Sequence, residues 1–513
     1  MSLLSLLACS LLALPALVAG SPLPPPLSYF RRNPITRREI NDATVRRELG
    51  PLLSNGTLMY GPEQTAFDTM TERWNRFVEP DVRVVVVPFV ESDVAKIVRY
   101  CNENSIDFLV KNRGHGFTTS LNSFSGLQIN MERLAGITIS EDKTTVLLQG
   151  GVYAGPVIEA LWDEGYITTT GSAACVGVLG PSLGGGHGRH EGLYGLVSDT
   201  ILHFNVVLAD GTAVGVNATS NEDLFWALQG AGHNFAIVTS IVKTIYPRQS
   251  PTWYTHSFVF SQDKLETIFE LLNEFHTSDN GTLPPLMGAT YSSFAMNPSF
   301  SETEAVISVG FDYNGPAEEA LAMIQPFTEI ESLQESGRDV TFPEISGVAA
   351  GSCGGADYIL SSAMLLEYNI TTERLLYNHF NEKVAANPEL GATAFLLHEG
   401  YATAGIKAID PASTAYGHRE ENFIMLFETI VPEGSDLAEP ATQWAKESVD
   451  IWNAGQPDRL PSTYVNYATG NEWETVESVY GHEEWRLQRL VDLKAKYDPL
   501  NRFRYYVPIE ASP

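Results

Sequence analysis

Two glycine-rich loops carry the residues of this chain that are best suited to chemistry. The first, Lys111-Asn-Arg-Gly-His-Gly-Phe117, follows a predicted strand and sets His115 between two glycines. The second is Val176-Gly-Val-Leu-Gly-Pro-Ser-Leu-Gly-Gly-Gly-His-Gly188. Glycine lets the backbone approach another group closely, and runs of such residues present several N–H donors to one anion, usually a phosphate. Together the loops predict a large phosphate-bearing cofactor with a histidine against its reactive end.

Other chemistries are compatible with parts of these loops. Gly180-Pro-Ser-Leu-Gly184 matches the G-x-S-x-G elbow of serine hydrolases, with Ser182 as the nucleophile. The glycines that follow are a poor start for the helix that an elbow requires. His187 and His190 could form a metal site with His115, but no acidic or cysteine partner stands in register, which favours packing histidines. The dinucleotide fingerprint G-x-G-x-x-G is absent from the loop.

Length and charge limit the class of protein. A chain of 513 residues predicts two or three domains. The net charge of −30 disfavours nucleic acid and anionic membrane surfaces as partners. Oligomeric state is left open.

The N-terminus predicts entry into the secretory pathway. Residues 1–20 form a short apolar run that ends in small residues, as a cleaved signal peptide does, although an N-terminal buried helix is an alternative. No other apolar run reaches the length of a membrane span, so stable membrane insertion is not expected. We expect a secreted protein or one in a vesicular or vacuolar compartment. Sequons compatible with glycosylation begin at Asn55, Asn217, Asn280 and Asn369.

The cysteines allow one disulfide at most. Cys9 leaves with the signal peptide, so Cys101, Cys175 and Cys353 remain, and one thiol is left over. Cys101 lies on an amphipathic stretch and is interpreted as a small core residue.

The order of predicted elements divides the chain. Residues 21–60 are rich in proline and arginine and indicate a linker or N-terminal arm. Strands and helices alternate up to Pro247, and beyond it the strands show the apolar–polar alternation of half-buried antiparallel sheets. The fold class predicted is α+β.

The motifs are specific when taken in order. The two loops are followed by Asn221-Glu-Asp-Leu-Phe-Trp-Ala-Leu-Gln-Gly-Ala-Gly-His-Asn-Phe-Ala-Ile-Val-Thr239, Tyr464-Val-Asn-Tyr467 and Asp498-Pro-Leu-Asn-Arg-Phe503. In this arrangement the chain resembles FAD-linked oxidoreductases of the vanillyl-alcohol-oxidase/p-cresol-methylhydroxylase superfamily, close to the berberine-bridge-enzyme-like branch and to fungal members of secondary metabolism. The resemblance is strong over roughly 60–250 and 460–510.

The resemblance implies a two-part FAD-binding domain of p-cresol-methylhydroxylase type with an inserted α+β substrate domain, an antiparallel sheet covered by helices. The expected ranges are 1–20 for the signal peptide, 21–60 for the arm, 61–250 for the FAD-binding domain, 251–460 for the substrate domain and 461–513 for the C-terminal part of the FAD-binding domain.

The resemblance also implies roles for single residues. His115 matches the histidine that bonds covalently to the flavin C8 methyl, and Tyr464, Asn466 and Tyr467 match a Tyr-x-Asn-Tyr strand near flavin and substrate. The positions implied to bind the cofactor are Arg113, Gly114, His115, Gly116, Val176, Gly177, Gly180, Gly184, Gly185, Gly186, Gly188, Gly232, Ile237, Val238 and Asn466.

The chain departs from the family pattern at two positions. Bicovalent members carry a cysteine at the position of Ala173, so a single covalent bond is predicted, with displaced Cys175 as the alternative second attachment. Relatives place a Glu or Gln base on a strand that here has Phe427 in register, with Glu428 on the opposite face. A tyrosine, Tyr467 or Tyr464, is therefore the predicted base.

The implied activity is an FAD-dependent oxidase. A hydride leaves a substrate C–H next to O–H or N–H, a base takes the proton, and dioxygen reoxidises the flavin to give hydrogen peroxide. Val176 stands where a small side chain in relatives is associated with oxygen access, which favours an oxidase over a dehydrogenase. The substrate expected is a small molecule, a secondary metabolite, with a carbohydrate or alcohol oxidase as one alternative. A serine hydrolase using Ser182 is the alternative from another class.

Overall fold

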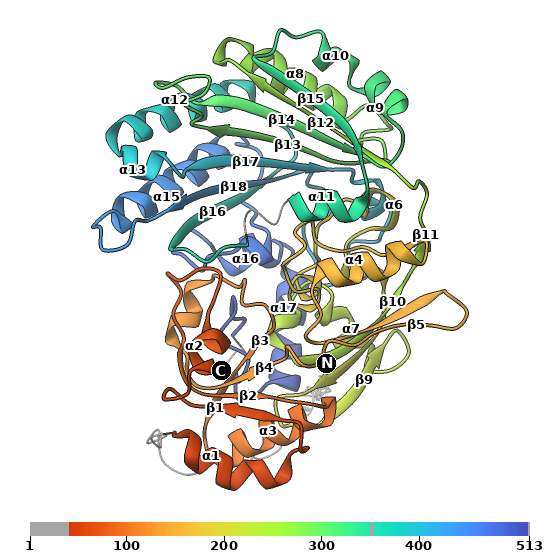
Figure 1. Ribbon diagram of the computed structural model, residues 1–513, viewed down its shortest axis with the longest axis vertical. Coiled ribbons are helices and arrows are strands. Elements are labelled where there is room, and N and C mark those ends of the chain that lie inside the picture. Colours follow the sequence, from red (N-terminus) through yellow and green to blue (C-terminus); the bar gives the residue numbers. More distant parts are fainter. Residues whose placement is uncertain (1–39, 349–352, 511–513) are drawn as a thin grey trace, which may run out of the picture.

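The computed structural model describes residues 40–348 and 353–510, and Figure 1 shows its arrangement. A large sheet with helices on its outer face lies above two smaller sheets. The predicted signal peptide and the first part of the predicted arm lie outside the described residues. Within those ranges, no helix is both long and apolar enough to cross a bilayer.

The first small sheet has the order β1-β2-β4-β3, and its last three strands are parallel. Valines fill β2, and α3 crosses from β2 to β3 with its apolar face buried. Cys101 lies in that face with no exposed surface, as its amphipathic setting predicts. The elements are β1 (Leu58–Tyr60), α2 (Ala66–Thr71), β2 (Asp81–Val87), α3 (Glu91–Glu103), β3 (Asp107–Lys111) and β4 (Ser125–Asn130).

The part of the predicted arm that is described is folded. Residues 42–60 form α1 (Asp42–Leu49), a 3-10 turn and β1, which pairs with β2. Val45 and Leu49, four residues apart on α1, are buried against the first sheet, while Arg46 and Arg47 lie on the outer side. The arginine-rich composition therefore hides a short amphipathic helix that the sequence interpretation assigned to a linker.

The second small sheet is antiparallel, with the order β5-β6-β10-β8-β9. A two-stranded ribbon of β7 and β11 and the helices α4 to α7 surround it. The elements are β5 (Ile137–Ile139), β6 (Thr145–Gln149), α4 (Ala154–Asp163), β7 (Tyr166–Ile167), α5 (Leu179–Leu183), α6 (Glu191–Tyr194), β8 (Ile201–Val207), β9 (Ala213–Asn217), α7 (Glu222–Leu228), β10 (Ile237–Thr244) and β11 (Tyr246–Pro247).

The large sheet contains seven antiparallel strands in the order β15-β12-β14-β13-β17-β18-β16. Helices α8, α12 and α15 cover one face, where Phe258, Phe294 and Phe427 are buried. The strands are β12 (Trp253–Phe260), β13 (Met287–Ala295), β14 (Val306–Tyr313), β15 (Gln334–Val340), β16 (Tyr358–Leu365), β17 (Phe395–Tyr401) and β18 (Phe423–Ile430). The helices are α8 (Leu265–His276), α9 (Ala317–Met323), α10 (Gln325–Thr328), α11 (Phe342–Val348), α12 (Ile370–Ala386), α13 (Pro388–Gly391), α14 (Ala404–Lys407) and α15 (Ala438–Ala454).

The C-terminal segment returns to the first half of the chain. Helix α16 (Val476–Tyr480) is followed by α17 (Glu484–Tyr497), which packs against α7. The side-chain amide of Asn234 donates to the Tyr480 hydroxyl and to the Val507 carbonyl. Residues 146–245 and 464–509 therefore share one core, with the large sheet inserted between them.

Candidate active site

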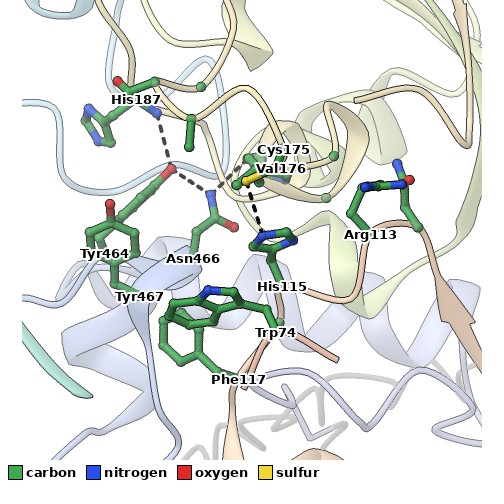
Figure 2. Close-up of a pocket in the computed structure, with 18 of the residues that line it drawn as sticks. Trp74, Arg113, His115, Phe117, Cys175, Val176, His187, Tyr464, Asn466 and Tyr467 are labelled. Atoms are coloured by element: carbon green, nitrogen blue, oxygen red, sulfur yellow. Dashed lines mark hydrogen bonds between the residues drawn. The ribbon is translucent and has the colours of Figure 1, made fainter. Parts of the chain in front are cut away.

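A cavity of about 880 Å³ lies between the two small sheets and the uncovered face of the large sheet. Residues from both halves of the chain line it, and Figure 2 shows the part around His115. Of the predicted cofactor positions and tyrosines, those on its wall are Arg113, Gly114, His115, Gly116, Val176, Gly177, Gly180, Ile237, Val238, Tyr464, Asn466 and Tyr467. Segments more than 300 residues apart in the sequence thus meet at one site.

The His115 ring is held flat in the loop that follows β3. It stacks on the indole of Trp74, with the ring centroids 5.9 Å apart and an interplanar angle of 15°. Its Nδ1 is buried and accepts or donates no hydrogen bond among the described residues. Burial, and then the positive charge of Arg113, lower the pKa of His115 to about 4. The imidazole is therefore neutral at neutral pH and keeps the lone pair that a nucleophile needs.

The second glycine loop approaches the cavity at Val176, Gly177 and Gly180. Its later glycines, Gly184 to Gly188, pack against protein atoms behind the wall, and Gly232 packs against Leu183. Gly185 and Gly186 have φ values of 93° and 88°, which side-chain-bearing residues rarely adopt. These later glycines shape the loop, whereas the earlier ones face the cavity.

The described residues contain neither the arrangement that a serine hydrolase needs around Ser182 nor a set of metal ligands. Ser182 is 1% exposed, and its hydroxyl donates to the Val178 carbonyl at 2.6 Å. His187 lies between the Glu191 carboxylate and the Tyr416 hydroxyl, so both ring nitrogens have partners. No group of three metal-ligating side chains occurs in the described part of the chain.

The two predicted tyrosines differ in their surroundings. The Tyr464 hydroxyl accepts the His187 backbone N–H at 3.2 Å and the Asn466 side-chain amide at 2.6 Å (Figure 2). The Tyr467 hydroxyl instead donates to Glu399 at 2.8 Å. Burial raises the pKa of both tyrosines. Tyr467 is thus the one coupled to a carboxyl group that can take its proton.

Glu399, on β17, is a site residue that the sequence interpretation missed. It is 6% exposed and receives hydrogen bonds from Tyr467 and from Tyr401, each at 2.8 Å. Burial raises the pKa of its carboxyl group. Strand alternation offered a signal, because Leu397, Glu399 and Tyr401 share one face of β17.

On β18 the expected cavity face is reversed. Phe427 packs against Trp444 under the helices, with ring centroids 4.9 Å apart. Glu428 does lie on the opposite face from Phe427, as expected, but that face lines the cavity. The sequence interpretation set Glu428 aside because the family register placed Phe427, and not Glu428, on the face toward the site.

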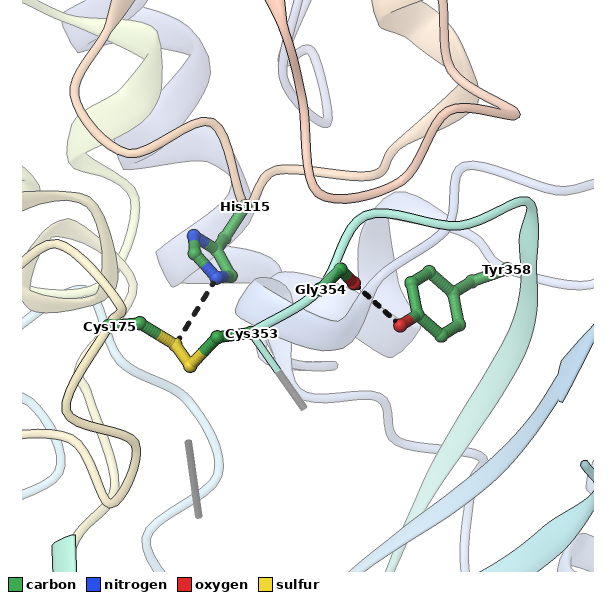
Figure 3. The surroundings of a disulfide bond; sticks show 5 residues. All are labelled: His115, Cys175, Cys353, Gly354 and Tyr358. Carbon is green, nitrogen blue, oxygen red and sulfur yellow. Dashed lines mark hydrogen bonds between the residues drawn. A yellow bond between two sulfur atoms is a disulfide. The ribbon is translucent and has the colours of Figure 1, made fainter. Parts of the chain in front are cut away.

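A disulfide joins Cys175 to Cys353 beside His115 (Figure 3). The Cys175 Sγ lies 3.8 Å from the His115 Nε2. The segment after Cys353 is tied to the first half of the chain, because Arg76 N–H donates to the Ala356 carbonyl at 2.9 Å and the Tyr358 ring stacks on Trp74 at 4.1 Å. The single disulfide permitted by the cysteine count is therefore present, and Cys101 is the leftover thiol.

The residues around the cavity fit a flavin dinucleotide. Glycine backbone from two loops faces the cavity, a neutral histidine has an unpartnered buried nitrogen, and the buried Nε and Nη1 of Arg73 also lack hydrogen-bond partners among the described residues. When bound, FAD would supply an acceptor of two electrons.

Comparison with known proteins gives the family. Residues 82–217 match the family model described as an FAD binding domain, and residues 463–510 match the model described as berberine and berberine like. The chain is 60% identical to FAD-linked oxidoreductase iacH of Pestalotiopsis fici over 97% of this chain and 96% of that one. It is 46% identical to FAD-linked oxidoreductase OXR2 of Pyricularia oryzae over 98% and 97% of the two chains.

Solved structures share the fold at low identity. Glucooligosaccharide oxidase from Acremonium strictum, described as carrying a 6-S-cysteinyl, 8α-N1-histidyl FAD, superposes with a TM-score of 0.77 at 20% identity, over 91% of this chain and 99% of that one. The α+β fold of the chain is shared with these solved structures. The protein is an FAD-linked oxidoreductase of the berberine-bridge-enzyme-like family.

Proposed function

We propose that the protein is an FAD-dependent oxidase that removes a hydride from a substrate C–H next to O–H or N–H, with dioxygen as the final acceptor and hydrogen peroxide as the product. The single observation that carries this proposal is the placement of a neutral His115 and the Tyr467–Glu399 pair on the wall of one cavity. The first is suited to holding a flavin and the second to moving a proton.

Tyr467 is the proposed base, and Glu399 is its proton acceptor. A substrate hydroxyl or amine loses its proton to the Tyr467 oxygen while the Tyr467 proton passes to Glu399 over the 2.8 Å hydrogen bond. Burial raises the pKa of Glu399, which makes its carboxylate a stronger proton acceptor. Tyr464 has a positioning role, because its oxygen already accepts two N–H donors.

The proposed attachment is a single bond through His115. In the Acremonium oxidase the flavin is named as both cysteinyl and histidyl. Here Cys175 is the cysteine beside His115, and its sulfur is already bonded to Cys353. Because its sulfur is used in the disulfide, the alternative second attachment through Cys175 is disfavoured, which supports the prediction of one covalent bond.

Location and substrate are proposals as well. A disulfide between described residues supports maturation in an oxidising compartment, which agrees with the predicted signal peptide and with a secreted or vesicular glycoprotein. A small secondary metabolite remains the proposed substrate class. A carbohydrate is the second candidate, supported only by the fold shared with oligosaccharide oxidases.

The first experiment is acid precipitation of purified holoenzyme, wild type and His115→Ala, followed by absorption spectra of pellet and supernatant. We expect yellow colour in the wild-type pellet and in the supernatant of the variant. Colour in the wild-type supernatant would contradict the proposed covalent bond. A folded but colourless protein would contradict the proposed oxidase function. Peroxide release on turnover tests the acceptor.

A further inference from the structure

Glu428 is a buried carboxyl group on the cavity wall for which the proposed mechanism has no use. It lies near the end of β18, the strand between β17 and β16 in Figure 1, and it is 9% exposed. Among the described residues, none donates a hydrogen bond to its oxygens and none forms an ion pair with it. A buried polar group without a protein partner is uncommon and calls for an explanation such as a ligand.

The side chains paired with Glu428 across the sheet are apolar, and the titratable group that its charge acts on is the Tyr358 hydroxyl. The cross-strand neighbours of Glu428 are Leu360 on β16 and Phe395 on β17, and both line the cavity. The next cavity-facing pair along the same strands is Leu397 and Leu426. Burial alone raises the pKa of Glu428 to about 7, since no cation is close enough to lower it.

Glu428 also lies away from the proton-transfer pair. Glu399 is opposite Ile424, four residues before Glu428 on β18. Four residues of a strand span about 13 Å. The wall between these two carboxyl groups is formed by Leu397 and Leu426, which pack with Phe117. A ligand that reaches both ends would therefore have an apolar middle.

We propose that Glu428 is a specificity-determining residue that accepts a hydrogen bond from an O–H or N–H group at the far end of an otherwise apolar, ring-bearing substrate. The bond being oxidised lies at the Tyr467–Glu399 end, and the donor lies at the Glu428 end. This assignment rests on the proposed function, whose chemistry defines which end of the substrate reacts.

The geometry selects probes of matching length. In a biphenyl with a hydroxymethyl group at one para position, a substituent at the other para position lies about 10 Å from that group, which is the strand distance of about 13 Å minus one hydrogen bond of about 3 Å. Three such probes differ only at the far position, which bears hydrogen, a hydroxyl or an aminomethyl group. Binding is measured from the change in flavin absorption on titration of oxidised holoenzyme, and reduction is measured without oxygen in a stopped-flow instrument.

At a pH well above 7, where the Glu428 carboxyl group is ionised, we expect wild-type holoenzyme to bind a donor-bearing probe about ten- to a hundredfold more tightly than the unsubstituted probe, because a hydrogen bond to a charged acceptor is formed. In Glu428→Leu, which matches the neighbouring leucines, the ratio should fall to about one. Glu367→Gln, at an exposed carboxyl group two residues after the end of β16, is the control and should keep the wild-type ratio. A preference for the hydroxyl or for the amine identifies the donor.

The proposal is overturned if wild type binds the three probes equally, if none changes the flavin spectrum, or if Glu428→Leu keeps the preference. It is also overturned if Glu428→Leu stops reduction by the unsubstituted probe while its binding is unchanged, since Glu428 would then act on the reacting atoms. Selective binding without flavin reduction by any probe supports the Glu428 assignment and counts against the proposed oxidase chemistry, so the two failures are distinguishable.

Discussion

Replacing Cys353 by serine should lower the stability of the folded chain by a calculable amount. The Cys175–Cys353 bond closes a loop over a sequence separation of 178 residues. In the chain-entropy model, a cross-link over a loop of that length lowers the entropy of the unfolded chain by an amount worth about 5 kcal/mol at 25 °C. For a chain of 513 residues this predicts a fall in Tm of roughly 5 °C.

The folded state keeps several contacts at the junction after the bond is lost. Two hydrogen bonds join Asn75 to the Tyr358 backbone, at 2.9 and 3.1 Å, and the Tyr358–Trp74 stacking is independent of the sulfurs. We therefore expect Cys353→Ser to fold and to bind flavin, with the loss confined mainly to stability. The entropic figure is an upper estimate of that loss.

The assay combines scanning calorimetry with thiol mapping by mass spectrometry. In unreduced, denatured wild type, Cys101 should be alkylated while Cys175 and Cys353 stay joined, which makes Cys101 an internal standard. Cys175→Ser, Cys353→Ser and the double variant should share one Tm, because each removes the same bond. Alkylation or flavin on Cys175 in unreduced wild type, or an unchanged Tm in Cys353→Ser, would refute the reasoning.

Three further outcomes follow from the structure. The rate of flavin reduction should fall as pH decreases through the raised pKa of Glu399, because the carboxylate is the form that accepts the proton. Glu399→Gln should lower this rate about 10²- to 10⁴-fold and remove the acidic limb of the pH profile. An unchanged profile would contradict the Tyr467–Glu399 assignment. Asp498→Asn leaves Lys494 buried without its counter-charge and should lower the free energy of unfolding, measured by chemical denaturation, by about 3–5 kcal/mol. The control Asp450→Asn breaks an exposed pair with Lys446 at the same i,i+4 spacing and should lower it by under about 1 kcal/mol. Equal losses would argue against an effect of burial. Glycopeptide mapping of protein from a eukaryotic secretory host should find sugar at the exposed sequons of Asn55, Asn280 and Asn369. It should find none at Asn217, whose half-buried side chain is hydrogen-bonded to His203. Occupancy of Asn217 would contradict this expectation.

Much of the fold was readable from local patterns. The amphipathic stretch that carries Cys101 is α3 (Glu91–Glu103), and the alternating strands expected beyond Pro247 begin with β12 (Trp253–Phe260) of the antiparallel sheet. Apolar periodicity predicts such elements well because each must bury one face. Residues 42–60 were missed because Val45 and Leu49 are two apolar positions among charged ones, a signal too short to read without the sheet that covers them.

The amino-acid sequence by itself determined the cofactor end of the site. His115 between two glycines, the second glycine loop and the Tyr-x-Asn-Tyr segment each depend on backbone geometry within a few neighbouring residues, and such geometry follows from residue type. The same motifs carry the resemblance to FAD-linked oxidoreductases, which depends on residue types and their order along the chain.

Only the tertiary structure decided the substrate end. Tyr467 and Glu399 are 68 residues apart, and their hydrogen bond exists because β17 lies beside the returning C-terminal segment. Alternation along β18 says that Phe427 and Glu428 point in opposite directions, but the helix layer packed on one side decides which of them faces the cavity. The same holds for Cys175 and Cys353, because a disulfide needs two sulfurs in contact, and contact between distant segments is a property of the packed chain.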